Sequence, residues 1–566
     1  MSRPRLYLLS VRISPDRPLP IAPYYETTHY QVAPRALLLM TTATRPLHKE
    51  AVRQAPPPVR GFLRRHWLPL LLACVCNTLA VARVQYVPGL LAVACAAFLL
   101  LQARSLRAAA VTGVAFMCGT AILLNYWMVP VLLKYTGGNW LMAIGCYVAS
   151  WTLMAPFFGL QFALFAFLRR RGGSVAAHWG NALLFAAVWV LFEWGRAWLF
   201  SAVPFMSYAW GSAAGQSTLL LQPAVFGGVF ALTFLLVLPA YLIAVSWHTR
   251  RWRAALPAVA LLLLQLTGGW ALHRAAETKA AGLPSINIAL VQPALSTDLL
   301  WDPQNGNRLV QHLLALNRQA AALRPALTVW TETTVPWTYR PDDDFVGALR
   351  TTSVAAGSAM LLGMSSDGTA ADPLRSNSLY LFDGAGALQG RYDKQELLAG
   401  AERPFVGGLV LPFQSGNGTR FRAGMGGAPV PSAWGPAGLL LCNEATIPAQ
   451  ARARAAAGAT WLAVLGNDNW FADTYVAAGH FNQCRIRAVE NRKDLVVNIN
   501  MGVAGVIRAA GDIAARFEGR ESAAQPASLQ LHEGLPPSHL FFNLLILVVL
   551  ATCNRFLFTK PPKHTV

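Results

Sequence analysis

The chain has 566 residues, of which 54% are hydrophobic and only 13% are charged, yet its formal net charge is +21. An average soluble domain carries about 25% charged residues, so this composition argues against a soluble enzyme, and it is too apolar for a disordered basic protein. A basic charge suggests nucleic acid as a partner, but it also arises when Lys and Arg collect on one side of a membrane.

The position of the charges separates these two interpretations. Residues 285–535 hold 21 of the 26 acidic and 20 of the 47 basic residues, so this segment is nearly neutral. The remaining basic residues lie in the N-terminal region and between long apolar runs. The pattern therefore predicts a membrane protein with one large soluble domain and no nucleic-acid partner.

The first stretch, residues 1–65, is rich in Pro and Arg and has no sustained hydrophobic periodicity. Its longest apolar run, 36–40, is too short for the core of a signal peptide. We expect residues 1–65 to form a basic, disordered cytoplasmic tail. Met40 is an alternative translation start, which would leave the preceding residues outside the protein.

Long apolar stretches follow this tail. A membrane-spanning helix needs about 20 mostly apolar residues. Residues 66–274 contain seven such stretches, and an eighth closes the chain. The predicted spans are 67–83, 86–103, 109–132, 140–168, 181–200, 219–247, 254–272 and 539–557. They predict a membrane α-helical bundle of about eight spans.

Basic residues orient this bundle. They collect at both ends of the chain and in every second loop, near 104–107, 169–171 and 250–253. The opposite short loops hold only four: Arg83, Lys134, Arg274 and Lys279. The excess of Lys and Arg on the cytoplasmic side of membrane proteins then places both termini in the cytoplasm and residues 285–535 on the other side.

Short β-rich runs alternate with helix-prone stretches in residues 285–535, which is typical of a layered α/β domain. The predicted strands are 286–291, 327–330, 360–364, 378–382, 438–441, 461–465 and 495–499. The predicted helices are 307–323, 448–457 and 476–492. About 250 residues suit a single domain.

Six of the eight cysteines lie in predicted spans, where Cys behaves as a small hydrophobic residue. Only Cys442 and Cys484 lie in the soluble domain, as either a disulfide or two buried thiols. Neither belongs to a CxxC pattern or has a nearby His pair, so the spacing predicts no metal site.

Three residues of the soluble domain are candidates for chemistry. Cys442 ends an apolar run before a helix-prone stretch, where unpaired N–H groups and the helix dipole would lower the pKa of its thiol. Glu332 directly follows a predicted strand beside Trp330, where burial would raise its pKa and suit a general base. Lys394 follows a strand-and-turn pattern. Each has a structural alternative: a packing thiol, a solvated loop carboxylate and a surface lysine.

Glu, Lys and Cys in this order, each at a strand end, resemble the nitrilase superfamily, whose domain is an αββα sandwich. Together with the eight spans, the pattern closely resembles the bacterial apolipoprotein N-acyltransferases over residues 66–557. The matching stretches are Gln292-Pro293 with Trp301-Asp302-Pro303, Trp330-Thr331-Glu332-Thr333, Tyr392-Asp393-Lys394 with Glu402, Cys442-Asn443-Glu444, Asn467-Asp468-Asn469-Trp470-Phe471 with His480, and Phe192-Glu193-Trp194 with Arg196.

The resemblance implies an acyl transfer in two steps. The thiolate of Cys442 takes an acyl chain from a membrane phospholipid as a thioester, and the N-terminal amine of a diacylglyceryl-modified lipoprotein then accepts it. Glu332 would be the general base, and Lys394 would stabilise the oxyanion of the tetrahedral intermediate. The resemblance implies no cofactor and no metal.

Other residues receive supporting roles from the resemblance. Glu402 and Glu444 would support Lys394 and the Cys442 loop, and Trp301 would line the substrate pocket. In the membrane part, Glu193 and Arg196 share a helix face, so they are either a functional pair or a structural ion pair. His480 is expected to be a packing or surface residue.

The predicted organisation has four parts: a tail over 1–65, a seven-span domain over 66–274, a nitrilase-like catalytic domain over 285–535 and a last span over 539–557. The resemblance places the protein in the bacterial inner membrane as a multi-pass protein, with the catalytic domain in the periplasm and both termini in the cytoplasm. We expect it to be a monomer.

Two departures from the family leave alternatives open. Asn443 stands where the family usually has Tyr, and Arg508 where many members have Asp. One alternative is a membrane-anchored amidase or nitrilase-type hydrolase, and another is a divergent paralogue with a different amine acceptor. A transporter or scaffold with a degenerate domain is a third, but it would have more polar spans than these.

Overall fold

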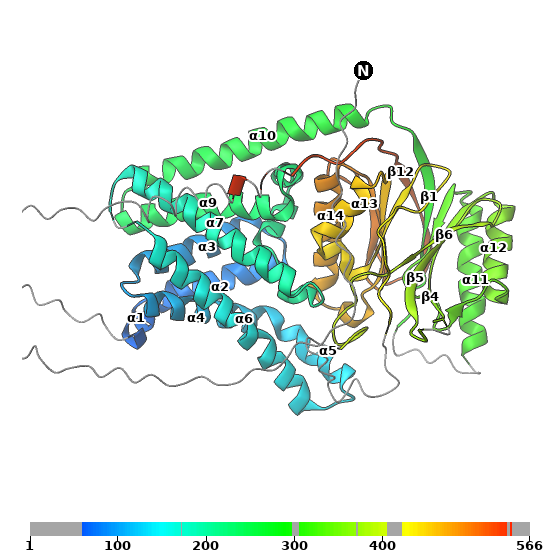
Figure 1. Cartoon of the computed structure of the whole chain (residues 1–566), viewed down its shortest axis with the longest axis horizontal. Coiled ribbons are helices and arrows are strands. Elements are labelled where there is room, and N and C mark those ends of the chain that lie inside the picture. Colours follow the sequence, from blue (N-terminus) through cyan, green and yellow to red (C-terminus); the bar gives the residue numbers. More distant parts are fainter. Residues whose placement is uncertain are drawn as a thin grey trace, which may run out of the picture. The chain divides into compact units, whose positions relative to one another are not determined.

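The computed structural model describes residues 59–170, 172–296, 305–369, 372–404 and 421–539, together with residues 541, 544 and 545 (Figure 1). Most of the predicted tail, nearly all of the predicted span 539–557 and the predicted pocket residue Trp301 lie outside the described residues.

The first half of the described chain consists of apolar helices. Their bounds are α1 (Val59–Arg65), α2 (Trp67–Ala82), α3 (Tyr86–Gln102), α4 (Leu106–Leu124), η1 (Asn125–Trp127), α5 (Met128–Tyr135), α6 (Trp140–Leu168), α7 (Val175–Leu199), α9 (Gly228–Thr249), η5 (Trp252–Ala255) and α10 (Leu256–Ala280). Five helical stretches in the described residues are long and apolar enough to cross a membrane: Leu106–Lys134, Trp140–Leu168, Val175–Leu199, Gly228–Thr249 and Trp252–Ala280.

The predicted number of eight spans is therefore not confirmed. The first two predicted spans correspond to α2 and α3, which have only 16 and 17 residues. The predicted span 219–247 also begins too early, because 218–226 form the short helix α8 (Thr218–Leu221) and the 3₁₀ turn η4 (Gln222–Phe226). Pro223 cannot donate a helical hydrogen bond, and Gly228, where α9 starts, has a φ of +62° that favours glycine.

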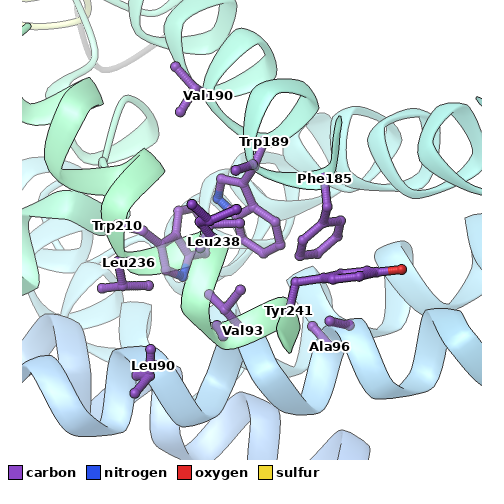
Figure 2. Close-up of a cluster of buried hydrophobic side chains, with 14 of the residues drawn as sticks. Leu90, Val93, Ala96, Phe185, Trp189, Val190, Trp210, Leu236, Leu238 and Tyr241 are labelled. Atoms are coloured by element: carbon purple, nitrogen blue, oxygen red, sulfur yellow. The ribbon is translucent and has the colours of Figure 1, made fainter. Parts of the chain in front are cut away.

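Aromatic side chains pack together with Leu, Val and Ala in the core of the helical part (Figure 2). The ring centroids of Phe185 and Trp189 on α7 are 5.4 Å apart, and Tyr241 on α9 lies 5.3 Å from Phe185. Trp210, the first residue of η3 (Trp210–Gln216), lies 5.2 Å from Trp189 in an edge-on arrangement. The connection between α7 and α9 is thus anchored in the helical core.

The second half contains two β-sheets. One holds β1 (Ser285–Gln292), β2 (Leu327–Val329), β3 (Thr338–Tyr339), β4 (Ala359–Ser366), β5 (Ser376–Phe382), β6 (Leu388–Asp393) and β12 (Ala523–Gln530). The other holds β7 (Ala437–Leu441), β8 (Trp461–Asn467), β9 (Leu495–Asn500), β10 (Val503–Ile507) and β11 (Ile513–Glu518). Their strand orders are β12-β1-β2-β4-β5-β6, with β3 beside β4, and β11-β10-β9-β8-β7.

Helices cover the outer faces of the sheets (Figure 1). The helices α11 (Gly306–Ala322) and α12 (Asp344–Ala355) pack on the seven-stranded sheet, and α13 (Pro448–Ala456) and α14 (Tyr475–Asn491) pack on the five-stranded sheet. Side chains from both sheets share the apolar layer between them. The predicted αββα sandwich is confirmed, and its layers bring the ends of strands from different sheets together.

Candidate active site

The three candidate residues follow strands of both sheets. Glu332 follows β2 and Lys394 follows β6, so both belong to the seven-stranded sheet, whereas Cys442 follows β7 of the five-stranded sheet. Both β6 and β7 are edge strands. The site therefore exists only when the two sheets are packed face to face.

Cys442 occupies an unusual backbone conformation. It is the first residue of the 3₁₀ turn η8 (Cys442–Thr446), and its φ is +49°. This left-handed region is uncommon for residues with a Cβ atom, and it persists where the surrounding structure constrains the backbone. Cys442 and Cys484 are both free, so the disulfide alternative is wrong. Cys484 is buried beneath α14 against the five-stranded sheet, whereas Cys442 lines a cavity.

A buried ammonium lies between two carboxylates beside this cysteine. The Nζ atom of Lys394 lies 2.8 Å from Oε2 of Glu402 and 3.6 Å from Oε1 of Glu332. The amide of Asn377 donates to Glu332 at 2.7 Å and to Glu402 at 3.1 Å. Only 2% of Lys394 and 6% of Glu332 are exposed, so Lys394 is not a surface lysine and Glu332 is not a solvated loop carboxylate.

The surroundings set the proton distribution of the site. Burial raises the pKa of Glu332, against the opposing charge of Lys394. Burial alone would lower the pKa of Lys394, but the carboxylates of Glu402 and Glu332 outweigh it and raise that pKa, which keeps the ammonium charged. Burial, reinforced by Glu332, also raises the pKa of the Cys442 thiol well above its usual value.

The last result corrects the expectation of a lowered thiol pKa. The turn η8 has only five residues, and the thiol of the half-buried Cys442 lies next to a carboxylate. The resting group is therefore a thiol, and it needs a base to take its proton when it reacts. Glu332, whose carboxylate is close enough to raise the pKa of the Cys442 thiol, is positioned to do this.

Glu444 connects the lysine segment to the cysteine turn. Its buried carboxylate accepts hydrogen bonds from the backbone N–H of Leu441 and of Gln395, each at 2.7 Å, and from the hydroxyl of Tyr392 at 2.7 Å. Arg454 also donates to the hydroxyl of Tyr392. The carboxylate of Glu444 therefore accepts hydrogen bonds from the backbone of segments that belong to both sheets.

The structure adds two residues to the site. His480 on α14 is buried, with its Nε2 atom 2.9 Å from the carbonyl oxygen of Cys442 and its Nδ1 atom 3.1 Å from Oδ1 of Asp468. His480 is therefore packed inside the domain, and the surface alternative is wrong. The only sequence signal was its place in the resemblance after Asn467-Asp468, because no local spacing links a helix residue to a turn 38 residues earlier.

A cavity lies between the helical part and the sandwich, and the cysteine turn forms part of its wall. Its lining includes Cys442, Asn443 and His480 from the sandwich, and Val81, Pro204 and Phe230 from the helical part. The two parts also bond directly to each other beside the lining residue Leu398, where the backbone N–H of Ala399 donates to the carbonyl of Ala202 at 2.9 Å. The thiol therefore faces a space with apolar walls formed by the membrane helices.

Glu193 and Arg196 have a different environment. The carboxylate of Glu193 accepts hydrogen bonds from the N–H of Trp210 at 3.0 Å and from the hydroxyl of Thr233 at 2.6 Å. Arg196 donates to the carbonyl of Tyr208 at 2.5 Å. Neither residue is among the described residues that line the cavity. Their side chains bond to neighbouring segments and not to each other, so they favour a structural role without forming the ion pair weighed above.

Two family models match this chain: the apolipoprotein N-acyltransferase N-terminal domain over residues 73–242 and carbon-nitrogen hydrolase over residues 287–516. The apolipoprotein N-acyltransferase of Pseudomonas putida is 30% identical over 409 residues, which cover 69% of this chain and 76% of that protein. The chain belongs to the apolipoprotein N-acyltransferase family. It is therefore an acyltransferase, and its apolar helices make it a multi-pass membrane protein.

One further relative and one solved structure are also similar to parts of this chain. The apolipoprotein N-acyltransferase of Geobacter metallireducens is 28% identical over 448 residues, covering 76% of this chain and 82% of that protein. A solved carbon-nitrogen hydrolase from Helicobacter pylori G27 is 15% identical, with a TM-score of 0.34, and covers 49% of this chain and 96% of that one.

Proposed function

We propose that this protein moves an acyl chain from a membrane phospholipid to the N-terminal amine of a diacylglyceryl-modified lipoprotein through a thioester on Cys442. The observation that carries the proposal is the free thiol on a cavity walled by membrane helices, with a buried carboxylate and ammonium beside it. Family membership supports the lipoprotein as acceptor.

In the first step, the sulfur of Cys442 attacks the ester carbonyl carbon of the phospholipid while Glu332 takes the thiol proton. The carbonyl electron pair moves to its oxygen, and the charged Lys394 stabilises that oxyanion. When the intermediate collapses, the ester C–O bond breaks and the lysophospholipid oxygen receives the proton from Glu332. The raised pKa of the thiol makes this base necessary.

In the second step, the lipoprotein amine attacks the thioester carbonyl. The amine loses a proton to Glu332, the C–S bond breaks, and the cysteine sulfur takes that proton back as a thiol. Two transfers through a covalent intermediate replace one difficult ester-to-amine transfer. Glu402 positions Lys394, and Glu444 positions the cysteine turn.

The membrane placement follows from both substrates being lipids. We assign residues 66–274 and 539–557 to the membrane and 285–535 to the catalytic domain. The excess of basic residues in alternate loops supports a periplasmic catalytic domain in a bacterial inner membrane, with both termini in the cytoplasm. A site at the bilayer surface brings donor and acceptor together without extracting either into water.

The test uses the full chain in nanodiscs with a phospholipid whose acyl chain carries an alkyne. We expect peptide mapping to find the labelled acyl group on Cys442, and the label to move to a synthetic diacylated lipopeptide. Cys442→Ala should abolish both signals, whereas Cys484→Ala, at the buried cysteine outside the cavity, should keep them once folding is verified.

Undiminished acylation of the lipopeptide by the Cys442→Ala variant would overturn the thioester mechanism. Release of free fatty acid at the same rate with or without lipopeptide would instead indicate a hydrolase with water as the acceptor.

A further inference from the structure

The imidazole of His480 lies between two groups that only accept hydrogen bonds. Its Nδ1 atom is 3.1 Å from a carboxylate oxygen of Asp468, and its Nε2 atom is 2.9 Å from the carbonyl oxygen of Cys442. A neutral imidazole carries one N–H and one bare nitrogen, so it could satisfy only one of these acceptors. Both contacts are satisfied when both ring nitrogens carry hydrogen, as in the imidazolium.

We propose that His480, held as an imidazolium by Asp468, is a positioning residue that fixes and polarises the peptide between Cys442 and Asn443. This inference rests on the function proposed above and adds to it a charged group that acts on the nucleophile through the backbone.

The strained turn gives this contact its importance. Cys442 has a φ of +49°, and such a conformation needs outside support. A charge-assisted bond to the Cys442 carbonyl supplies that support from α14. It also draws electron density toward the carbonyl oxygen, which makes the N–H of Asn443 a stronger donor. An N–H directly after the nucleophile is suited to bind the oxyanion.

The helix that carries His480 is itself firmly held. Asn482 donates to the carbonyl of Ser212 at 2.9 Å, and Arg485 donates to the carbonyl of Gly215 at 2.5 Å. Both acceptors belong to η3 of the membrane part. The position of the imidazolium is therefore set by bonds to a neighbouring element and does not depend on substrate.

The groups around the ring favour its charge. Asp468 follows β8, Glu332 follows β2 and Cys442 lies in η8, while the phenols of Tyr208 and Tyr475 line the same cavity. Burial alone would lower the pKa of His480, but Asp468 outweighs it, with a further contribution from Glu332, and raises the pKa. The ring therefore keeps its charge at pH values where an exposed histidine, with a pKa of about 6.5, is neutral.

The decisive variant is Asp468→Asn, which keeps the shape and one acceptor but removes the charge that holds the proton. Because burial is then no longer outweighed, the pKa of its ring should drop below the wild-type value. Below this lowered pKa, the initial rate of thioester formation on Cys442 should match the wild type. Above it, the rate should fall about tenfold, less than the 10²–10³-fold loss typical when an oxyanion donor is removed outright. A purely structural loss would lower the rate by the same factor at every pH.

The matched control is Asp512→Asn, which makes the same change at another His–Asp pair. The Nε2 atom of His273 lies 2.7 Å from Oδ2 of Asp512, and neither residue is among those lining the cavity. This variant should keep the wild-type pH profile. A second variant, His480→Gln, can donate to the Cys442 carbonyl without a charge, and it should lower the maximal rate of thioester formation with little change in KM for phospholipid.

An Asp468→Asn profile parallel to the wild type, or a His480→Gln rate equal to it, would overturn the proposal. If the wild type forms no thioester, the proposed function fails instead, and ¹⁵N NMR of histidine-labelled protein still tests the imidazolium. Above about pH 7.5, where a free imidazole is neutral, the wild type should retain one doubly protonated ring that His480→Gln lacks. A spectrum with only neutral rings there would reject the inference.

Discussion

Two groups of buried charged residues differ in whether a reactive atom beside them lines a cavity. Around Lys394, the carboxylates of Glu332 and Glu402 surround an ammonium, and the thiol of Cys442 beside them lines a cavity. In α7, Glu193 and Arg196 direct their bonds to the backbone and a hydroxyl of neighbouring segments. Burying a charge is costly in both places, but only the first group has a reactive atom that substrate can reach. An ionisable residue within a membrane helix is thus no evidence of chemistry until its partners are known.

The largest effect that would test this comparison is expected for Glu332→Gln. Removing a general base lowers rates by about 10²–10⁴-fold, so thioester formation on Cys442 should fall by that much. Because burial raises the pKa of Glu332, its protonated form persists to higher pH than in an exposed Glu. The wild-type rate should therefore rise with pH through a value above about 4.3, and the variant should lack this rise. If the rate of the Glu332→Gln variant rises with pH as the wild-type rate does, the general base is another group.

A somewhat smaller loss is expected for Lys394→Met. It leaves two buried carboxylates without their cation and removes the stabilisation of the oxyanion, so thioester formation should fall by about 10²–10³-fold. Lys493→Met is the matched control, because Lys493 is also buried but donates to the carbonyls of His532 and Gly534. Its rate per folded molecule should stay near the wild type. A fall of less than tenfold in Lys394→Met would contradict the oxyanion role.

The smallest effect on chemistry is expected for Glu193→Gln. The neutral amide weakens two charge-assisted bonds to Trp210 and Thr233, so Tm should decrease. The acylation rate per folded molecule should stay within about threefold of the wild-type rate. Glu193 does not line the cavity, so its replacement should displace the reacting atoms only slightly. A loss above tenfold with unchanged Tm would break the comparison and make the membrane pair part of the reaction.

The buried layers of the fold could be predicted from the sequence because they are continuous apolar runs. All seven predicted strands and all three predicted helices are present, with ends that differ by a few residues. The strands β3, β6, β10, β11 and β12 were not predicted. Exposed or half-buried residues dominate β6, β11 and β12, and β12 even contains Pro526, whereas β3 has only two residues and the buried β10 only five. Such strands form through pairing with a neighbour, which local sequence does not encode.

In the helical part, composition predicts apolar segments more reliably than it predicts their ends. Hydropathy continues through 218–227, but Pro223 and Gly228 divide that segment into a short helix, a turn and a new helix. The lengths of α2 and α3 are likewise set by where neighbouring turns begin.

In the candidate site, the order Glu332, Lys394, Cys442 and their strand ends could be predicted from the sequence. The contact of His480 with the Cys442 carbonyl could not, because it depends on how α14 packs across the end of a sheet. The raised pKa of the thiol was missed for the same reason. It results from burial and from a carboxylate that follows a strand of the opposite sheet.

The bonds of Glu444 have a mechanical consequence. Leu441 precedes the nucleophile on one sheet and Gln395 follows the lysine of the other, and a single carboxylate holds the N–H groups of both. Sliding of the two sheets would have to stretch these short, charge-assisted bonds before it could change the separation of the thiol and the ammonium. These bonds therefore restrain thermal motion between the two sheets at the active site, where a displacement of about one ångström would slow the reaction most.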